Sequence, residues 1–327
     1  MFVSFNIMKI AIIDGVNQDI GLKILFQEAD YFINNIEINK RDSLQKYNID
    51  MNPDWSLIND KNYDYLFIII SLYDAFKERK FFKQNIFNIL QKELQIVNNN
   101  SFKKVCIFDN YDYDYDPNEI IKNKNIDLFF KRNYNKHKSY KKNVVPFPFI
   151  MFGKKSLIEK LDETNNNDIK HNRLFFSGCL FTHIDNEINY VRDRRRMYNK
   201  IFNIVYNPGR LNYNDFLKCI RESKYALDLN GVGDPNKRTF EILSQNTLRI
   251  GEYNNLKWPF SEEFCEETIF KTAEELIEKL NHLERNVDIY NKCLENQKKI
   301  YNKYFNKKWI KSYIINYIIE CNIMDKH

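Results

Sequence analysis

The stretch SKYALDLNGVGDPNKRTFEILSQNTLRIGE, residues 223 to 252, decides the fold of the second half of this chain. It contains an apolar run that ends at Gly231, a polar turn, an amphipathic segment and a second apolar run; these are residues 225–231, 232–235, 236–245 and 247–252. Apolar strand, helix and apolar strand in this order predict a parallel βαβ unit. Because the chain has only 8 glycines, we expect Gly231 and Gly233 to hold backbone positions that other residues cannot occupy.

The same alternation runs along most of the chain. Further strands are expected at 9–14, 65–70, 104–110, 127–132, 173–178 and 203–209, further helices at 189–202 and 213–223, and long amphipathic helix from about 272. The proline-containing run VVPFPF, residues 144–149, is interpreted together with 163–168 as the connection between domains, because proline removes a strand donor. The pattern predicts an α/β protein of two Rossmann-like domains, 1–150 and 151–310, that face each other across a cleft. A terminal helix, 311–327, is expected to cross back to the first domain.

The segment after Gly231 has the chemistry of an anion site. Asp234 and Pro235 are favourable start signals for a helix, whose amino end carries unpaired N–H groups and a positive dipole. Arg238, one turn inside, could bind phosphate oxygens in bidentate fashion, and Glu241 on the same face could accept hydrogen bonds from sugar hydroxyls. In the plainer alternative the glycines only shape a turn and Arg238 pairs with Glu241.

Other candidate residues follow neighbouring strands. Gly178, Gly209 and Gly231 end three successive predicted strands, at the edge where open α/β sheets bind ligands. Arg194 and Arg195 fall on the apolar stripe of the helix 189–202 and there require an anion, unless the run RDRRR is simply a solvated cluster. Tyr206 and Arg210 follow the middle strand and are expected to line a slot for a base.

The stretch 223–252 resembles the donor-binding signature of GT-B glycosyltransferases, especially the exostosin-like and spore-coat-protein-like groups. The resemblance extends over roughly residues 173–260 and implies that Arg238 contacts the donor diphosphate and Glu241 the ribose. Arg194 or Arg195, after a loop similar to FFSGC, would grip the same diphosphate. Retaining members often carry a second glutamate eight positions before the one matched by Glu241. Gly233 stands there, which favours inversion.

Three carboxylates are candidates for the base that deprotonates an acceptor hydroxyl. Asp112 and Asp114 lie in the acidic run FDNYDYDYDPNE, residues 108–119, and Asp14 ends the first predicted strand. The repeated Asp-Tyr pattern also permits a different interpretation, in which the carboxylates bind Mn²⁺ or Mg²⁺. In that case a metal-dependent transferase would be the result.

Composition narrows the possible partners. The formal charge of +6 is a small difference between 50 basic and 44 acidic groups, so nucleic acid is not expected as a partner. The basic run 131–142 is interpreted as a solvated loop or as a contact to phosphate or to an anionic membrane surface. Six widely spaced cysteines without a CxxC pair argue against a zinc site or a disulfide framework. With no leader pattern or membrane span recognised, we predict a cytoplasmic location.

The predicted function is transfer of a sugar from a nucleotide-diphosphate sugar, UDP- or GDP-linked, to a hydroxyl of a glycan or glycoconjugate. The mechanism is expected to be inverting and independent of metal, with no cofactor besides the donor. A non-catalytic nucleotide- or glycan-binding module of the same fold remains the alternative.

Overall fold

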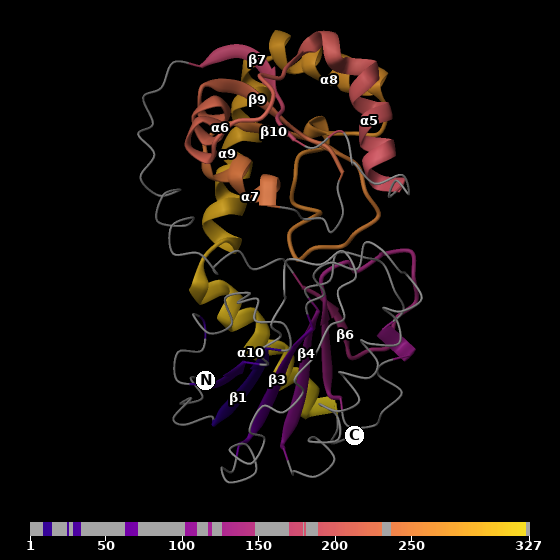
Figure 1. The fold of residues 1–327 in the computed structure, drawn as a ribbon, viewed down its shortest axis with the longest axis vertical. Helices are drawn as coiled ribbons and strands as arrows, with labels where there is room; N and C mark the ends of the chain where they lie inside the picture. The colour runs from indigo at the N-terminus through magenta and orange to yellow at the C-terminus, as the bar shows by residue number, and fades with distance from the viewer. Residues whose placement is uncertain are drawn as a thin grey trace, which may run out of the picture. The chain divides into compact units, whose positions relative to one another are not determined.

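The computed structural model describes residues 9–14, 25, 29–33, 63–70, 102–109, 117–119, 126–147, 170–178, 180, 189–230 and 237–324 (Figure 1). The chain divides into two compact units. The first unit comprises Met1–Tyr134, Lys138–Gly153 and Ile310–His327, and the second comprises Asn135–His137 and Lys154–Trp309. Each unit is built on its own parallel sheet.

The sheet of the first unit has six parallel strands in the order β2-β1-β3-β4-β5-β6. Their bounds are β1 (Ile10–Asp14), β2 (Asp30–Ile33), β3 (Tyr65–Ile70), β4 (Lys104–Asp109), β5 (Leu128–Lys131) and β6 (Val144–Pro146). A short 3-10 helix, η1 (Pro117–Glu119), lies between β4 and β5 in sequence. The four strands expected in this half are confirmed as β1, β3, β4 and β5, whereas β2 was not foreseen.

The interpretation of residues 144–149 as a connection is wrong for its first three residues. Val144 and Val145 are buried and form β6, which pairs with β5 in the register Phe129 to Val144. Proline is tolerated in this strand because β6 is at the edge of the sheet, where one side needs no ladder donor. The Pro146 carbonyl accepts a hydrogen bond from the Tyr313 hydroxyl at 2.6 Å.

Aromatic rings fill the core of the first unit. Phe108 stacks on Phe130 with ring centroids 4.7 Å apart, and Phe147 meets both rings edge-on at 5.5 Å. Helix α10 (Lys307–Met324) adds Tyr317, whose ring lies edge-on to Phe130 at 6.2 Å. The last helix of the chain therefore contributes to the core formed by the first strands, as Figure 1 shows by the yellow helix beside indigo and magenta strands.

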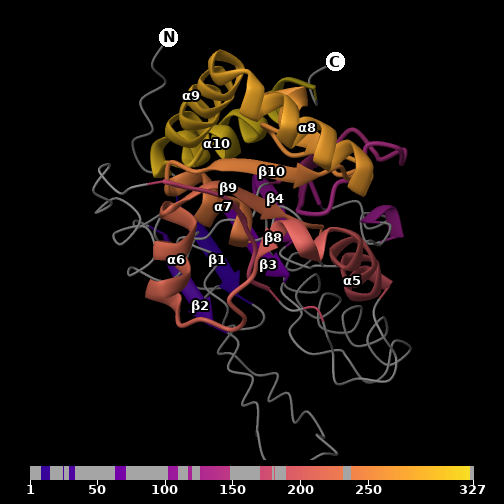
Figure 2. The ribbon, with the colours of Figure 1, turned by 90° about the horizontal axis from the view of Figure 1, so that it is seen from above.

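The sheet of the second unit has five parallel strands in the order β11-β10-β9-β7-β8. The strands are β7 (His171–Phe175), β8 (Val205–Tyr206), β9 (Ser223–Asp228), β10 (Leu248–Glu252) and β11 (Ile269–Phe270). The helices are α5 (Asn189–Ile201), η2 (Phe202–Ile204), α6 (Tyr213–Arg221), α7 (Lys237–Ser244), η3 (Glu266–Thr268), α8 (Ala273–Arg285) and α9 (Val287–Tyr304). In Figure 2, α8 and α9 lie on one side of β9 and β10, and α6 lies on the other.

Both sheets have the same doubly wound strand order. Numbered from its own first strand, the first sheet runs 2-1-3-4-5-6 and the second runs 2-1-3-4-5, so in each the direction in which successive strands are added reverses once. Ligands of open α/β sheets bind outside the carboxyl ends of the strands at this reversal. The reversal falls between β1 and β3 in the first unit and between β7 and β9 in the second. The predicted α/β class with two Rossmann-like sheets is confirmed.

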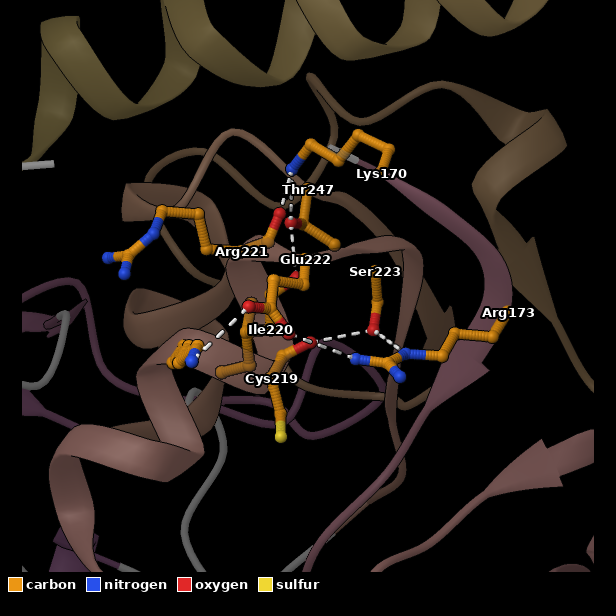
Figure 3. A network of polar contacts seen from close by, with 9 residues as sticks. Lys170, Arg173, Cys219, Ile220, Arg221, Glu222, Ser223 and Thr247 are labelled. Atoms are coloured by element: carbon orange, nitrogen blue, oxygen red, sulfur yellow. Dashed lines mark hydrogen bonds and ion pairs between the residues drawn. The ribbon is translucent and has the colours of Figure 1, made fainter. Parts of the chain in front are cut away.

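A polar network caps the carboxyl end of α6 (Figure 3). The last carbonyls of a helix have no partner inside it. Here four successive carbonyls accept hydrogen bonds from the Ser223 hydroxyl at 2.6 Å, the Thr247 hydroxyl at 2.7 Å, the Lys170 ammonium at 2.5 Å and the His171 amide at 2.7 Å; these carbonyls belong to Cys219, Ile220, Arg221 and Glu222. Arg173 in turn donates to the Ser223 hydroxyl at 2.8 Å. The network fixes α6 to the amino ends of β7, β9 and β10.

One side chain takes the place of a strand beside β10. The short strand β11 pairs only with Gly251 and Glu252. Further back, the buried Gln297 amide of α9 accepts from the Arg249 amide at 2.8 Å and donates to the Thr247 carbonyl at 2.6 Å. The backbone of β10 is thus satisfied on that side by α9, which ties this helix to the sheet.

Candidate functional site

Arg238 lies at the carboxyl edge of the second sheet, near the end of β7. Its side chain comes from the first turn of α7, and its Nη2 donates to the Ser177 carbonyl at 2.9 Å. The guanidinium stacks over the Phe176 ring at 4.6 Å. A Cβ atom added to Gly178 would lie 2.1 Å from Nη2, so any other residue there would force the guanidinium to move. The predicted diphosphate arginine is therefore held beside the predicted loop glycine.

A chain of hydrogen bonds links the ends of β7 and β8. The Ser177 hydroxyl donates to the Gly209 carbonyl at 2.9 Å, and the Gly209 amide donates to the Asn207 side chain at 3.0 Å. Gly209 has a φ of +84°, a conformation that favours glycine. The Asn207 amide group donates to the Tyr198 hydroxyl of α5 at 3.0 Å. The loops after two neighbouring strands thus form one polar rim.

Asn230, two residues after the end of β9, connects three elements. Its amide donates to the Glu252 carboxylate at 2.9 Å, and its side chain donates to the Tyr253 carbonyl at 2.8 Å. Its own carbonyl accepts from Arg194 Nε at 2.9 Å. Arg194 is therefore half-buried and donates to a backbone carbonyl just beyond the end of β9; its expected role as an anion ligand stays a prediction.

A buried ion pair fixes α7 to the strands beneath it. Arg249 Nε donates to Asp228 Oδ2 at 2.6 Å, and the two side chains are 5% and 3% exposed. The Thr239 hydroxyl of α7 donates to the same oxygen at 2.8 Å. Gly251 lies beside the pair, and a Cβ there would approach Arg249 Nη1 to 2.3 Å. Gly251 leaves room for Arg249, and the ion pair holds α7 in position through Thr239. Arg238 is carried by the same helix.

Glu241, the predicted ribose residue, is buried on α7 with 4% of its surface exposed. Its Oε1 is 3.4 Å from Lys237 Nζ, and Lys237 also stacks over the Tyr213 ring at 4.5 Å. Burial raises the pKa of Glu241, and Lys237 and Tyr213 partly oppose this by stabilising the charged form. A buried carboxylate needs polar partners, and Lys237 and Tyr213 supply them here.

The expected base-slot residues lie near β8. Tyr206 is 40% exposed, and the Arg173 guanidinium covers its ring at 4.1 Å. Arg210 is exposed beyond the Gly209 turn, and Arg195 is half-buried on α5. Their roles stay predictions.

Several predicted site residues lie outside the described part of the chain. These are Gly231 and Gly233 of the donor loop and the carboxylates Asp112 and Asp114. Asp14 is described by its backbone, which ends β1 opposite Ile69 of β3. It therefore stands at the strand reversal of the first sheet.

The sequence reasoning missed a buried charge pair in the first unit. Lys131 Nζ lies 3.4 Å from Asp109 Oδ2, and both side chains are fully buried at the carboxyl ends of β5 and β4. Lys131 begins the basic run interpreted as a solvated loop, so that interpretation is wrong for Lys131 and for the buried Arg132. The available signal was that two adjacent apolar strands each end in an opposite charge.

The cysteines also depart from expectation. The spacing along the chain argued against a zinc site, yet the fold brings Cys265 and Cys293 together with Glu267. Their sulfur and oxygen atoms all lie within 4.8 Å of one another. Such a cluster could not be found from sequence, because its members come from separate elements.

The chain is a two-unit α/β protein, and Arg238 and the polar rim lie at the carboxyl edge of its second sheet, beside the strand reversal. Residues 157–311 match the family model described as glycosyl transferase-like. This stretch is therefore glycosyl transferase-like, and the resemblance inferred from residues 223–252 is confirmed. No curated protein matches the chain in sequence.

Similar solved structures include T4 phage BGT in complex with UDP and Mn²⁺, at 15% identity and a TM-score of 0.47, covering 95% of this chain and 99% of that one. Anabaena Alr3699/HepE in complex with UDP and glucose is 12% identical with a TM-score of 0.49, covering 96% of this chain and 100% of that one. Among the described helices, none is both long and apolar enough to cross a bilayer.

The buried pair gives a stability prediction. Arg249→Met keeps an aliphatic stem but leaves the Asp228 carboxylate without its cation inside the fold, which costs about 3–5 kcal/mol. We expect the urea midpoint of the second unit to fall strongly. Lys298→Met, which breaks an exposed pair with Glu295, should change the free energy of unfolding by less than about 1 kcal/mol. Equal midpoints for both variants would contradict the structural role of the pair.

Glu241 gives a pH prediction. Because its folded pKa is raised above the ordinary 4.5, the native state holds the proton more tightly, and this carboxyl lowers stability as pH rises above 4.5. Glu241→Gln should therefore gain thermal stability relative to wild type as pH increases from 4 to 8. Glu275, whose pKa is lowered chiefly by the Lys271 amide, is the control: Glu275→Gln should lose relative stability over the same series. Parallel melting profiles for wild type and Glu241→Gln would contradict the assignment.

Proposed function

We propose that the chain is a glycosyltransferase that takes a sugar from a nucleotide-diphosphate sugar, with UDP or GDP as the nucleotide. The second unit binds the donor, and the first unit binds a glycan or glycoconjugate hydroxyl. The glycosyl transferase-like stretch supports the reaction class. The observation that carries the donor site is the Arg238 guanidinium held against Gly178 at the carboxyl edge of the sheet.

Charge on the leaving diphosphate would be stabilised by residues already fixed in place. Arg238 and Arg194 come from different helices, and each donates to a backbone carbonyl at the end of β7 or β9. Guanidinium groups oriented beforehand stabilise developing charge without reorganising during the reaction. We therefore propose that diphosphate departure needs no divalent cation.

The base that accepts the acceptor proton is proposed to be a carboxylate of the first unit. Asp14 is favoured because it ends β1 at the strand reversal, where doubly wound sheets bind ligands. Asp112 and Asp114 remain candidates from the sequence. Direct attack by an activated hydroxyl on the sugar gives inversion at the anomeric carbon.

The donor site is tested by nucleotide binding. Among UDP, GDP, CDP and ADP, we expect one to raise the melting temperature, because it binds only the folded state. Arg238→Ala should weaken that nucleotide at least about tenfold, since a hydrogen bond to a charged group contributes about 1.5–3 kcal/mol. Gly178→Ala should weaken it too, because the new Cβ displaces the guanidinium. Isothermal calorimetry measures both.

Lys218→Ala is the control, because this exposed lysine contacts Glu222 on the capped end of α6. It should bind the nucleotide as wild type does. A Gly178→Ala protein with wild-type affinity would argue against a donor site at Arg238.

A variant of the proposed base distinguishes an enzyme from a protein that only binds the nucleotide. Asp14→Asn should lower kcat by about 10²–10⁴-fold, the usual contribution of a general base, while the affinity for the nucleotide is unchanged. Turnover is followed by release of the nucleotide diphosphate and by mass of the product, with and without added Mn²⁺. For the wild type we expect the same rate of turnover with and without added Mn²⁺. Nucleotide binding without turnover on any acceptor would favour the binding-module alternative.

A further inference from the structure

The turn before β11 brings two thiols and a carboxylate to one point. Cys265 is the residue before η3, Glu267 lies within η3, and Cys293 comes from the middle of α9. Their ligand atoms all lie within 4.8 Å of one another. Cys293 is 2% exposed, and Cys265 packs against the same core cluster. The chain of the second unit thus collects three metal-ligating side chains at the border of its core.

The backbone that carries these side chains is itself held in place. The Cys265 carbonyl accepts from the Thr268 amide at 3.0 Å and from the Thr268 hydroxyl at 2.8 Å. Lys279 of α8 donates to the Glu266 carbonyl at 2.6 Å, and Asn296 of α9 donates to the Glu263 carbonyl at 2.6 Å. Two helices therefore fix the backbone of the turn that carries Cys265 and Glu267.

We propose that Cys265, Glu267 and Cys293 bind one Zn²⁺ ion. Two sulfur ligands and one carboxylate suit Zn²⁺, whereas Mg²⁺ and Mn²⁺ prefer sites made of oxygen alone. Ligand atoms at about 2.0–2.3 Å from one ion stand roughly 3.3–3.8 Å apart in a tetrahedron, and the three atoms here already lie within 4.8 Å of one another. Three protein ligands leave the fourth position for water.

The ion would join η3 to α9, and it would not contact Arg238 or the polar rim. The turn precedes β11 on the amino side of that strand, while Arg238, Ser177 and Asn230 gather at the carboxyl ends of the strands. Binding that exists only in the folded state stabilises it. The zinc site therefore acts on stability, and it is independent of the proposed transfer reaction.

The test uses the full-length chain, reduced, freed of metal by a chelator and then titrated with Zn²⁺ and with Co²⁺. We expect a single ion per chain by elemental analysis, a rise in melting temperature with Zn²⁺, and a thiolate-to-metal absorption band with Co²⁺. Cys293→Ser and Glu267→Gln should lose the melting shift, and Cys293→Ser should also weaken the absorption band. Glu267 is only half-buried, so we expect Glu267→Gln to fold. This variant therefore tests the site even if Cys293→Ser does not fold.

Cys219→Ser is the matched control, since this thiol lies on α6 and outside the cluster. It should respond to both metals as wild type does. A Zn²⁺ shift of equal size in Glu267→Gln, or no thiolate band with Co²⁺, would overturn the proposal. Peptide masses that reveal a Cys265–Cys293 disulfide in protein purified with Zn²⁺ present would overturn it as well.

Discussion

The hydrogen-bonded ion pair between Asp228 and Arg249 is the constraint on which the second unit depends. Neither charge reaches water, so each must stay with the other. Because Asp228 also accepts from Thr239, the pair sets the height and rotation of α7 above the sheet. The backbone amide of Arg249 is bound by Gln297 of α9. One buried carboxylate thus aligns two strands and the helix that presents Arg238, while the same arginine residue brings α9 into register.

Two glycines of the second unit lie against arginine side chains. Gly178 leaves space for the guanidinium of Arg238, and Gly251 leaves space for that of Arg249. An added Cβ would lie 2.1 Å from the first guanidinium and 2.3 Å from the second, so the missing side chain is what leaves the space. The first arginine lies at the rim, where a phosphate could approach, and the second lies in the interior, where it neutralises a carboxylate. Similar local geometry therefore occurs both at the rim of the sheet and in its interior.

Most of the longer strands could be predicted from the sequence, because a strand that is buried on both faces of a parallel sheet appears as a continuous apolar run. Helical periodicity, which depends only on nearby residues, put Arg194 on the apolar stripe of α5, and its side chain is half-buried; its role toward a ligand stays a prediction. Sequence reasoning missed β2, β6 and β11, which are short edge strands of four, three and two residues with too few residues to show a period. Asp109 with Lys131, and Cys265 with Cys293, were missed because their partners meet only after the strands and helices pack. The donor loop itself, with Gly231 and Gly233, stays a prediction from sequence.

Gln297 has a consequence for how the protein behaves among other copies of itself. A strand at the border of a sheet offers unpaired amides and carbonyls to any extended segment that meets it, which is the usual route to aggregation. At Thr247 and Arg249 those groups are already bound to the Gln297 side chain. An amide on a packed helix cannot recruit another strand, so at this point the sheet is closed to growth from outside.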